Sequence, residues 1–199
     1  GVLGAILRAL RNLSLRAAVV NVVLGERMAR ETRKHAGARA RIEVLHNWAD
    51  GDAISPIAPG ENPLRPAWDL AGKFVVEYSG NMGQVHEFKT ILDAAQRLSD
   101  RPEIVFLFIG SGFYRVWIEE EVRARNLANI LFKPYQPREQ LSESLGIADM
   151  HLISLLPAME GRVVPSKIYG IMACGRPTLN IGDPAGEIAE ILGTAKAGF

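Results

Sequence analysis

From residue 74 onward the sequence alternates between β-rich runs and helical segments, and this alternation most constrains the fold. The β-rich runs cover 74–80, 104–109, 129–132, 149–155 and 178–181. The segments with helical spacing of apolar residues cover 86–98, 113–126, 137–145, 165–174 and 184–192. Strict alternation on this scale predicts an α/β fold with a parallel sheet and helices on both faces. Ligands of such sheets bind beyond the carboxyl ends of the strands.

The first 50 residues follow a different pattern. They predict a helix with Leu or Ile at positions 3, 6, 7, 10 and 13, then strands at 17–23 and 42–45 around a helix at 25–36. With Arg8 and Arg11 opposite its apolar stripe, the first helix fits either packing on its own domain or lying on a membrane surface. Segment 51–72 is rich in proline and lacks periodicity, which predicts a linker or surface loop. We therefore expect a boundary near residue 50, with 1–50 and 51–199 as separate units.

Composition and charge exclude several classes of protein. The 23 basic and 22 acidic residues nearly cancel, and no basic run with interleaved aromatic residues indicates a nucleic-acid-binding surface. The single cysteine, Cys174, excludes an internal disulfide and a multi-cysteine zinc site. No segment approaches the roughly 18–20 apolar residues that a membrane-spanning helix requires.

The most informative local motif is the run Glu160-Gly161-Arg162-Val163-Val164-Pro165-Ser166-Lys167. An acid in a loop precedes a helix that opens Pro165-Ser166-Lys167. Because a helix N-terminus has unsatisfied N–H groups and a partial positive charge, a lysine in its first turn is unfavourable unless an anion lies there. The motif indicates a phosphate or diphosphate site, with Glu160 placed to hold the hydroxyls of a phosphorylated sugar. The simpler alternative is a proline-started helix with a solvated Lys and Glu.

Two glycine turns follow successive strands at the edge where such a ligand would lie. They are Gly80-Asn81-Met82-Gly83 and Gly110-Ser111-Gly112, and each allows backbone to approach a phosphate or serves only as a turn. His86 fits an anion donor or a solvated surface residue. Lys133 and Tyr135, at the end of the third strand, fit a frame for a flat base or an ordinary strand end.

In this order the motifs resemble those of family 4 glycosyltransferases. Tyr78 to Gly83 with the helix after it is similar to the first strand–loop–helix of their nucleotide-binding domain, with Asn81 and His86 at the positions of the usual Arg and Lys. The remaining similar stretches are Phe108 to Gly112, Phe132 to Tyr135, Ala148 to Met150, and Glu160 with Met172 to Thr178. The resemblance covers about residues 40 to 192 and favours the bacterial capsule, exopolysaccharide and O-antigen transferases.

The resemblance implies a Rossmann-like GT-B architecture. Residues 51–199 would form the C-terminal donor-binding domain, and 1–50 the tail of a second Rossmann-like, acceptor-binding domain, with Asn47 to Asp50 at the junction. It also implies a retaining, metal-independent transferase without a cofactor. Such an enzyme moves a sugar from a UDP- or GDP-sugar to a glycan or lipid-linked acceptor in cell-surface polysaccharide synthesis. The expected location is the cytoplasm, at the inner face of the membrane, with peripheral contact through the N-terminal domain.

Carried over residue by residue, the resemblance assigns catalytic roles to Glu160 and Lys167. It assigns donor binding to Gly80, Asn81, Gly83, His86, Gly110, Ser111, Gly112, Lys133, Tyr135, Pro165 and Ser166. The sequence departs from the family where Gly170 replaces the second glutamate of a pair, and we expect Lys167 to carry phosphate charge in place of the missing Arg. The alternatives are a non-catalytic nucleotide-binding fragment and a GT-B nucleotide-sugar 2-epimerase. We expect the isolated chain to be inactive as a transferase.

Overall fold

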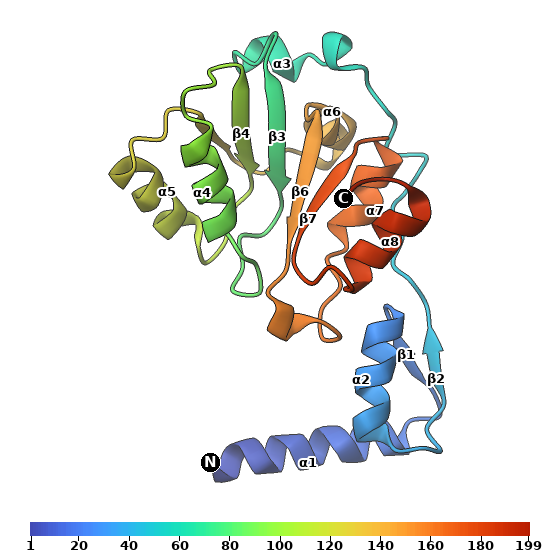
Figure 1. Ribbon diagram of the computed structural model, residues 1–199. Coiled ribbons are helices and arrows are strands. Elements are labelled where there is room, and N and C mark those ends of the chain that lie inside the picture. Colours follow the sequence, from blue (N-terminus) through green and yellow to red (C-terminus); the bar gives the residue numbers. More distant parts are fainter.

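The computed structural model describes residues 1–199 as a larger body and a smaller N-terminal unit (Figure 1). The strands of the larger body are β3 (Phe74–Ser79), β4 (Ile104–Ile109), β5 (Ile130–Lys133), β6 (Met150–Ser154) and β7 (Thr178–Ile181). Its helices are α3 (Leu64–Ala67), α4 (Lys89–Arg97), α5 (Arg115–Ala124), α6 (Leu141–Gly146), α7 (Lys167–Ala173) and α8 (Glu187–Ala195). The predicted alternation is confirmed, with shifted element ends.

The five strands form one parallel sheet in the order β5-β4-β3-β6-β7. Successive strands are added on one side of the sheet from β3 to β5 and on the other side from β6 to β7. The order in which strands are added therefore reverses between β3 and β6, although all five strands are parallel. The ladder between β3 and β4 covers six residue pairs. The ladder between β3 and β6 covers only Val76↔Met150 and Glu77↔His151. A reversal of this kind opens a crevice at the carboxyl ends of the two strands.

Helices cover both faces of the sheet, as the sequence predicts. On one face, Val76 and Tyr78 pack with Ile91 of α4 and Ile118 of α5. On the other face, Val75 packs with Leu70 and Ile147. Farther along that face, Ile153 of β6 packs with side chains of α7 and α8, which include Ile168, Ile171, Ile188 and Leu192. Burial on both faces explains why the strands are continuous apolar runs in the sequence.

Segment 51–72 lies on the surface of the larger body with most of its residues exposed, which agrees with the predicted surface loop, but it is anchored at Ile54, Asn62, Arg65 and Leu70 and is not a free linker. The buried Arg65 donates to the Ile147 carbonyl and lies 2.6 Å from the Asp149 carboxylate. Asp149 also accepts a hydrogen bond from the Val75 N–H at 2.7 Å. The segment is rich in proline and has no apolar repeat, so its periodicity does not predict this packing. Polar side-chain contacts help to hold the segment in place.

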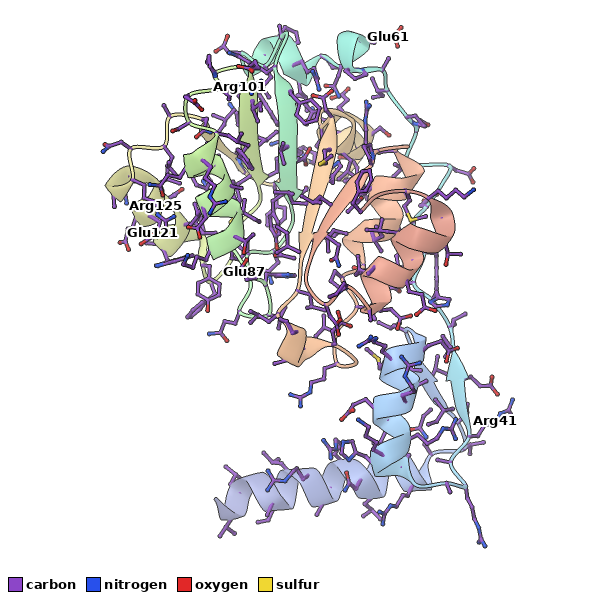
Figure 2. All side chains as sticks on the ribbon, viewed as in Figure 1. Arg41, Glu61, Glu87, Arg101, Glu121 and Arg125 are labelled. Atoms are coloured by element: carbon purple, nitrogen blue, oxygen red, sulfur yellow. The ribbon has the colours of Figure 1, made fainter.

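The N-terminal unit contains α1 (Val2–Ala17), β1 (Asn21–Val23), α2 (Glu26–Ala36) and β2 (Ile42–Val44), and its two strands pair in parallel. No residue of α1 is buried. The exposed apolar stripe is Leu3, Ile6, Leu7, Leu10 and Leu13. It is therefore not packed on this chain, and Figure 2 shows side chains of α1 projecting freely along most of the helix. None of the helices has the length and apolar character that crossing a membrane would require.

Glu187 joins the N-terminal unit to the larger body. Its carboxylate accepts hydrogen bonds from the backbone N–H groups of Glu26 at 3.2 Å and Arg27 at 2.9 Å, at the start of α2. The Arg27 side chain pairs with Asp183 at 3.1 Å. A carboxylate at a helix N-terminus satisfies free N–H groups and complements the helix dipole. The contact between the start of α2 and α8 (Figure 1) thus combines these polar contacts with the packing of Leu24 and Met28 on the apolar cluster that includes Ile188 and Leu192.

We predict that Glu187→Ala loosens this junction. Removal of both acceptors should weaken the start of α2 by about 1–3 kcal/mol, and amide exchange in residues 26–36 should accelerate accordingly. Hydrogen–deuterium exchange read by mass spectrometry measures this directly. The matched control is Glu190→Ala, an exposed acid on the same helix. Equal exchange in the two variants would show that Glu187 does not hold α2.

Candidate functional site

A cavity of about 740 Å³ lies where β3 and β6 separate at their carboxyl ends. The larger body contributes Ala53, Ile54, Ser79, Gly80, Asn81, Val85, His86, Tyr135, Arg138, Leu141, Leu145, Val163 to Lys167, and Gly170, and the junction contributes Asn47 to Asp50. A second hollow of about 770 Å³, near Arg176, Pro177 and Phe199, lies beside the start of β7 rather than at the carboxyl ends of the strands. The first cavity is therefore the candidate site.

Lys167 is the chemically most unusual group of this cavity. Its Nζ lies 3.6 Å from the centroid of the Tyr78 ring and next to the Gly80 turn. The ammonium is buried and has no protein hydrogen-bond acceptor. Burial lowers the pKa of Lys167 to about 7, and the charge of Glu77 partly opposes this. An unsatisfied buried ammonium is costly, and an anion bound at Lys167 would offset that cost.

The anion site depends on this side chain rather than on the helix end that the sequence suggested. Helix α7 has only seven residues, and Lys167 is the first of them. Its macrodipole is correspondingly small, since the dipole sums over aligned peptide units. Pro165 and Ser166 line the cavity beside Lys167, as predicted.

A buried polar pair lies beneath the lysine. Glu77 and His151 are paired residues of β3 and β6 and are fully buried, with His151 Nε2 3.9 Å from Glu77 Oε2. His151 Nε2 donates to the Leu145 carbonyl at 2.8 Å. Burial raises the pKa of Glu77 well above its usual value, and it lowers the pKa of His151 to about 4. Sequence reasoning missed this pair, although an acid inside the apolar run 74–79 was a usable signal.

His86 lines the cavity from the loop before α4, not from within the helix. Its Nδ1 lies 2.6 Å from the carbonyl oxygen of Ser154. A carbonyl can only accept, so Nδ1 carries the proton. Burial is the main cause of a lowered pKa of His86, which favours the neutral ring with Nε2 as an acceptor. The expected donor to an anion is therefore better placed to accept a hydrogen bond from a hydroxyl group.

The two predicted glycine turns pack against each other. The Met82 N–H donates to the Ser111 carbonyl at 2.8 Å, and the Gly80 N–H donates to Ile109 at 2.9 Å. Gly110 and Gly112 have φ values of +127° and +148°, and a Cβ on either would overlap the 80–82 segment. Gly80 and Asn81 line the cavity, whereas Gly110, Ser111 and Gly112 do not. The second turn thus packs against the first turn and supports it, but it does not itself line the cavity.

Three further predicted residues lie outside the cavity lining. Gly83 is next to the Asn81 side chain and accepts the His86 N–H through its carbonyl. Lys133 packs against Trp68 instead, with its Nζ 5.0 Å from the ring centroid. Glu160 Oε2 accepts the Glu187 N–H at 3.4 Å, at the start of α8. The structure thus does not bring Glu160 and Lys167 into one site.

The cavity rim has residues that sequence reasoning did not assign to the site. Trp48 and Arg138 both line it, and the Arg138 guanidinium is 3.8 Å from the Asp50 carboxylate. Tyr135, which was predicted, also lines the cavity, with its ring against Gly110. Gly170 lies beside Leu145 and Ile54, so the cavity wall is apolar at the position where the resemblance implied a second glutamate. The only sequence signal for the rim was the junction motif at Asn47 to Asp50.

Comparison with known proteins gives this site a family context. The family model described as "Glycosyl transferases group 1" matches residues 63–199. The chain belongs to this family. The five-stranded sheet and most of the residues that line the cavity lie in the matched segment, and the lining residues between 47 and 54 lie before it. The predicted Rossmann-like α/β fold of the GT-B type is confirmed by the solved structures described below, while the donor-binding role of residues 51–199 and membership of family 4 stay predictions.

Two curated relatives are named as glycosyltransferases, one of them as an enzyme of colanic acid biosynthesis. The chain is 29% identical over 159 residues to the putative colanic acid biosynthesis glycosyl transferase WcaI of Escherichia coli K12. It is 25% identical over 178 residues to the probable glycosyltransferase WbjE of Pseudomonas aeruginosa. The alignments cover 79% and 89% of this chain but only 39% and 44% of the relatives. The chain therefore corresponds to less than half of either protein.

Solved structures share the fold at low sequence identity. Anabaena Alr3699/HepE in complex with UDP-glucose superposes with a TM-score of 0.73 at 19% identity, over 93% of this chain and 50% of that one. WaaG, a glycosyltransferase involved in lipopolysaccharide biosynthesis, gives a TM-score of 0.72 at 16% identity, over 89% of this chain and 48% of that one.

We predict that Gly110→Ala destabilises the protein by about 2–4 kcal/mol, because a Cβ would overlap the Gly80 carbonyl and the positive φ is strained for alanine. Urea unfolding measures the loss. The control is Gly193→Ala in α8, where a Cβ meets nothing within 4 Å; there, helix propensity should make the change neutral or stabilising by up to about 1 kcal/mol. Equal stabilities of the two variants would refute the packed-turn interpretation.

Proposed function

We propose that this chain is the donor-binding part of a glycosyltransferase that uses a UDP- or GDP-sugar. The sugar would pass to a glycan or lipid-linked acceptor in bacterial cell-surface polysaccharide synthesis. The observation that carries the proposal is the buried Lys167 ammonium, which lines the cavity at the switch point of the sheet without a protein acceptor. The family match and the name of WbjE support the reaction class, and the name of WcaI, from colanic acid biosynthesis, supports the pathway.

The diphosphate would lie between Lys167 and the Gly80–Asn81 turn. Both line the same cavity, and the Lys167 Nζ lies next to Gly80, where it would contact a Cβ placed on that residue. Charge-assisted hydrogen bonds from an ammonium to phosphate oxygens are about twice as strong as neutral ones. Tyr135, exposed at the rim and packed against Gly110, would offer its ring to the base.

The sugar would then extend toward the loop 163–166 and the junction residues 47–50, which complete the lining. His86 Nε2 would accept a hydrogen bond from a donor hydroxyl, because Nδ1 is held by the Ser154 carbonyl. Glu160 would take part only if it leaves the start of α8. The acceptor would approach over Trp48 and Arg138, where residues 1–50 meet the cavity as part of an acceptor-binding domain.

In the proposed reaction the bond between the anomeric carbon and the diphosphate oxygen breaks, and an acceptor oxygen bonds to that carbon with retained configuration. The departing diphosphate gains negative charge. A fixed cation in a low-dielectric cavity stabilises such charge without reorganisation, which is the role of Lys167. We propose that no metal or other cofactor takes part.

We further propose that the whole protein works in the cytoplasm at the inner membrane face, with peripheral contact on the acceptor side. The exposed apolar stripe of α1 and the unpaired outer edges of β1 and β2 support a larger acceptor domain around residues 1–50. The isolated chain would then bind donor nucleotide without transferring sugar.

Lys167→Met should weaken binding of UDP or GDP by about 1–3 kcal/mol, the range for loss of a charge-assisted hydrogen bond. Calorimetry at pH 6.5 measures the change. Lys133→Met is the matched control, because this lysine lies against Trp68 outside the cavity. The proposal fails if the two variants lose affinity equally, or if the wild-type chain binds nucleosides as tightly as their diphosphates.

Glu160→Ala tests the separate assignment of the acid. If Glu160 holds donor hydroxyls, the variant keeps its affinity for UDP and loses the extra affinity of the matching UDP-sugar. If it only accepts the N–H at the start of α8, both affinities stay unchanged and thermal stability falls. Paired titrations with UDP and a panel of UDP-sugars distinguish these results, and the second would remove Glu160 from the proposed site.

A further inference from the structure

Trp48 is a large apolar side chain exposed to solvent at the mouth of the candidate cavity. It follows β2 on the junction segment, is 76% exposed and lines the cavity. The other two tryptophans are placed differently. Trp68 lies under the Lys133 ammonium at 5.0 Å, and Trp117 packs edge-on against Tyr114 at 5.7 Å. The Trp48 indole has no aromatic or cationic partner in the protein, so its ring is available to a ligand.

Polar side chains with unused hydrogen-bonding capacity line the same mouth of the cavity. Asp50 Oδ1 accepts hydrogen bonds from the N–H groups of Asp52 and Ala53, both at 3.2 Å, which holds the carboxylate in place. Its other oxygen, Oδ2, lies 3.8 Å from the Arg138 guanidinium, and this distance is too long for a hydrogen bond. The Arg138 guanidinium and the Asn47 amide therefore keep free donors, and Asp50 keeps a free acceptor.

This combination of side chains matches the chemistry of a sugar ring. A pyranose has an apolar face of C–H groups, which packs on a flat aromatic ring, and hydroxyl groups at its edge, which both donate and accept hydrogen bonds. Trp48 offers the aromatic surface. Arg138 only donates, ionised Asp50 only accepts, and Asn47 does both. Ligand sites commonly combine an aromatic lining with a few polar groups that fix the orientation of the ligand.

Depth in the cavity separates these groups from the place proposed for the diphosphate. The Lys167 ammonium is buried, whereas the Trp48 and Arg138 side chains are exposed. Lys167 also belongs to the larger body, whereas Trp48 and Asp50 belong to the junction segment that follows β2. A ligand on Trp48 therefore lies at the entrance of the cavity. This is the side from which an acceptor reaches a donor whose diphosphate is bound at the base.

We infer that Trp48 is the surface on which a sugar ring of the acceptor stacks, with Asn47, Asp50 and Arg138 holding its hydroxyl groups. The inference deepens the proposed function, since it rests on this cavity as the donor site and names the acceptor as a glycan. Trp48 binds the acceptor and takes no part in breaking or forming a bond. A lipid phosphate that carries no sugar would make no use of this surface.

The indole N–H signals of the three tryptophans allow a test on the wild-type chain. Each tryptophan gives one such signal in a ¹H–¹⁵N spectrum, and Trp48→Phe assigns the signal of Trp48. Cellotriose, chitotriose and lactose are titrated with and without UDP at millimolar concentrations, where weak contacts still give measurable occupancy. We expect at least one of these sugars to move the Trp48 signal, while the signals of Trp68 and Trp117 stay in place.

The choice of probes follows from the chemistry of stacking. An indole packs on the C–H face that many pyranoses share, so the test does not require the natural acceptor. If none of the three sugars moves the Trp48 signal, with or without UDP, the inference is overturned.

Substitutions then test whether the indole itself supplies the affinity. Trp48→Ala should weaken binding of the responding sugar by about three- to tenfold, the scale of one aromatic contact, and Trp48→Phe should keep most of the affinity because it keeps a flat ring. Trp117→Ala is the matched control, since it removes an indole that lies outside the cavity lining. Saturation-transfer NMR on the sugar protons measures all four proteins. Equal affinities of Trp48→Ala and the wild-type chain would place the sugar elsewhere and overturn the inference.

Titrations with UDP and UDP-glucose separate this inference from the proposed function. We expect UDP to shift the backbone signals of Gly80 and Asn81 and to leave the Trp48 indole signal in place. If UDP moves the indole signal as far as a sugar does, the indole stacks on the base and the inference fails. If UDP-glucose moves it and no free sugar does, the indole holds the donor sugar and the acceptor role fails. If a free sugar moves it while UDP does not bind, the proposed function fails and the sugar-binding surface stands.

Discussion

The candidate site depends on the short ladder between β3 and β6. These neighbouring strands share only two residue pairs, the last of which is Glu77↔His151, and then separate. Full pairing would have filled the space that Lys167 and the cavity occupy. The strands can separate because the backbone groups beyond the ladder find other partners. The Gly80 N–H donates to β4, the Leu156 N–H donates to Val85, and the Ser154 carbonyl accepts from His86.

Stability and function make opposite demands at this point. The sheet around it is apolar and well packed, yet it encloses an unpartnered ammonium and carboxylate. Such groups lower the stability of the fold, and they suit the diphosphate binding that we propose for this cavity. The supporting structure is correspondingly rigid, with two glycine turns in close backbone contact and a histidine fixed by a carbonyl.

The sheet, its helices and the loops of the site could be predicted from the sequence because each has a local signature. Alternating apolar runs, glycine turns and the Pro165-Ser166-Lys167 start identified the layers and the edge where ligands bind. The directions of side chains could not be predicted. Lys133 turns to Trp68, and Glu160 turns to α8, because tertiary contacts several segments away decide their orientation. Glu77 was overlooked since periodicity treats it as one polar residue in a strand, and its importance depends on its neighbour β6.

The central claim is that Lys167 receives the diphosphate of the donor nucleotide at the separation of β3 and β6. A crystal structure of the chain with UDP tests it most directly. The account predicts a phosphate oxygen within about 2.7–3.2 Å of the Lys167 Nζ, with the diphosphate beside Gly80 and Asn81. UDP bound elsewhere, for example in the hollow near Arg176 and Phe199, or bound in the cavity with Lys167 still turned to Tyr78 and away from phosphate, would contradict it.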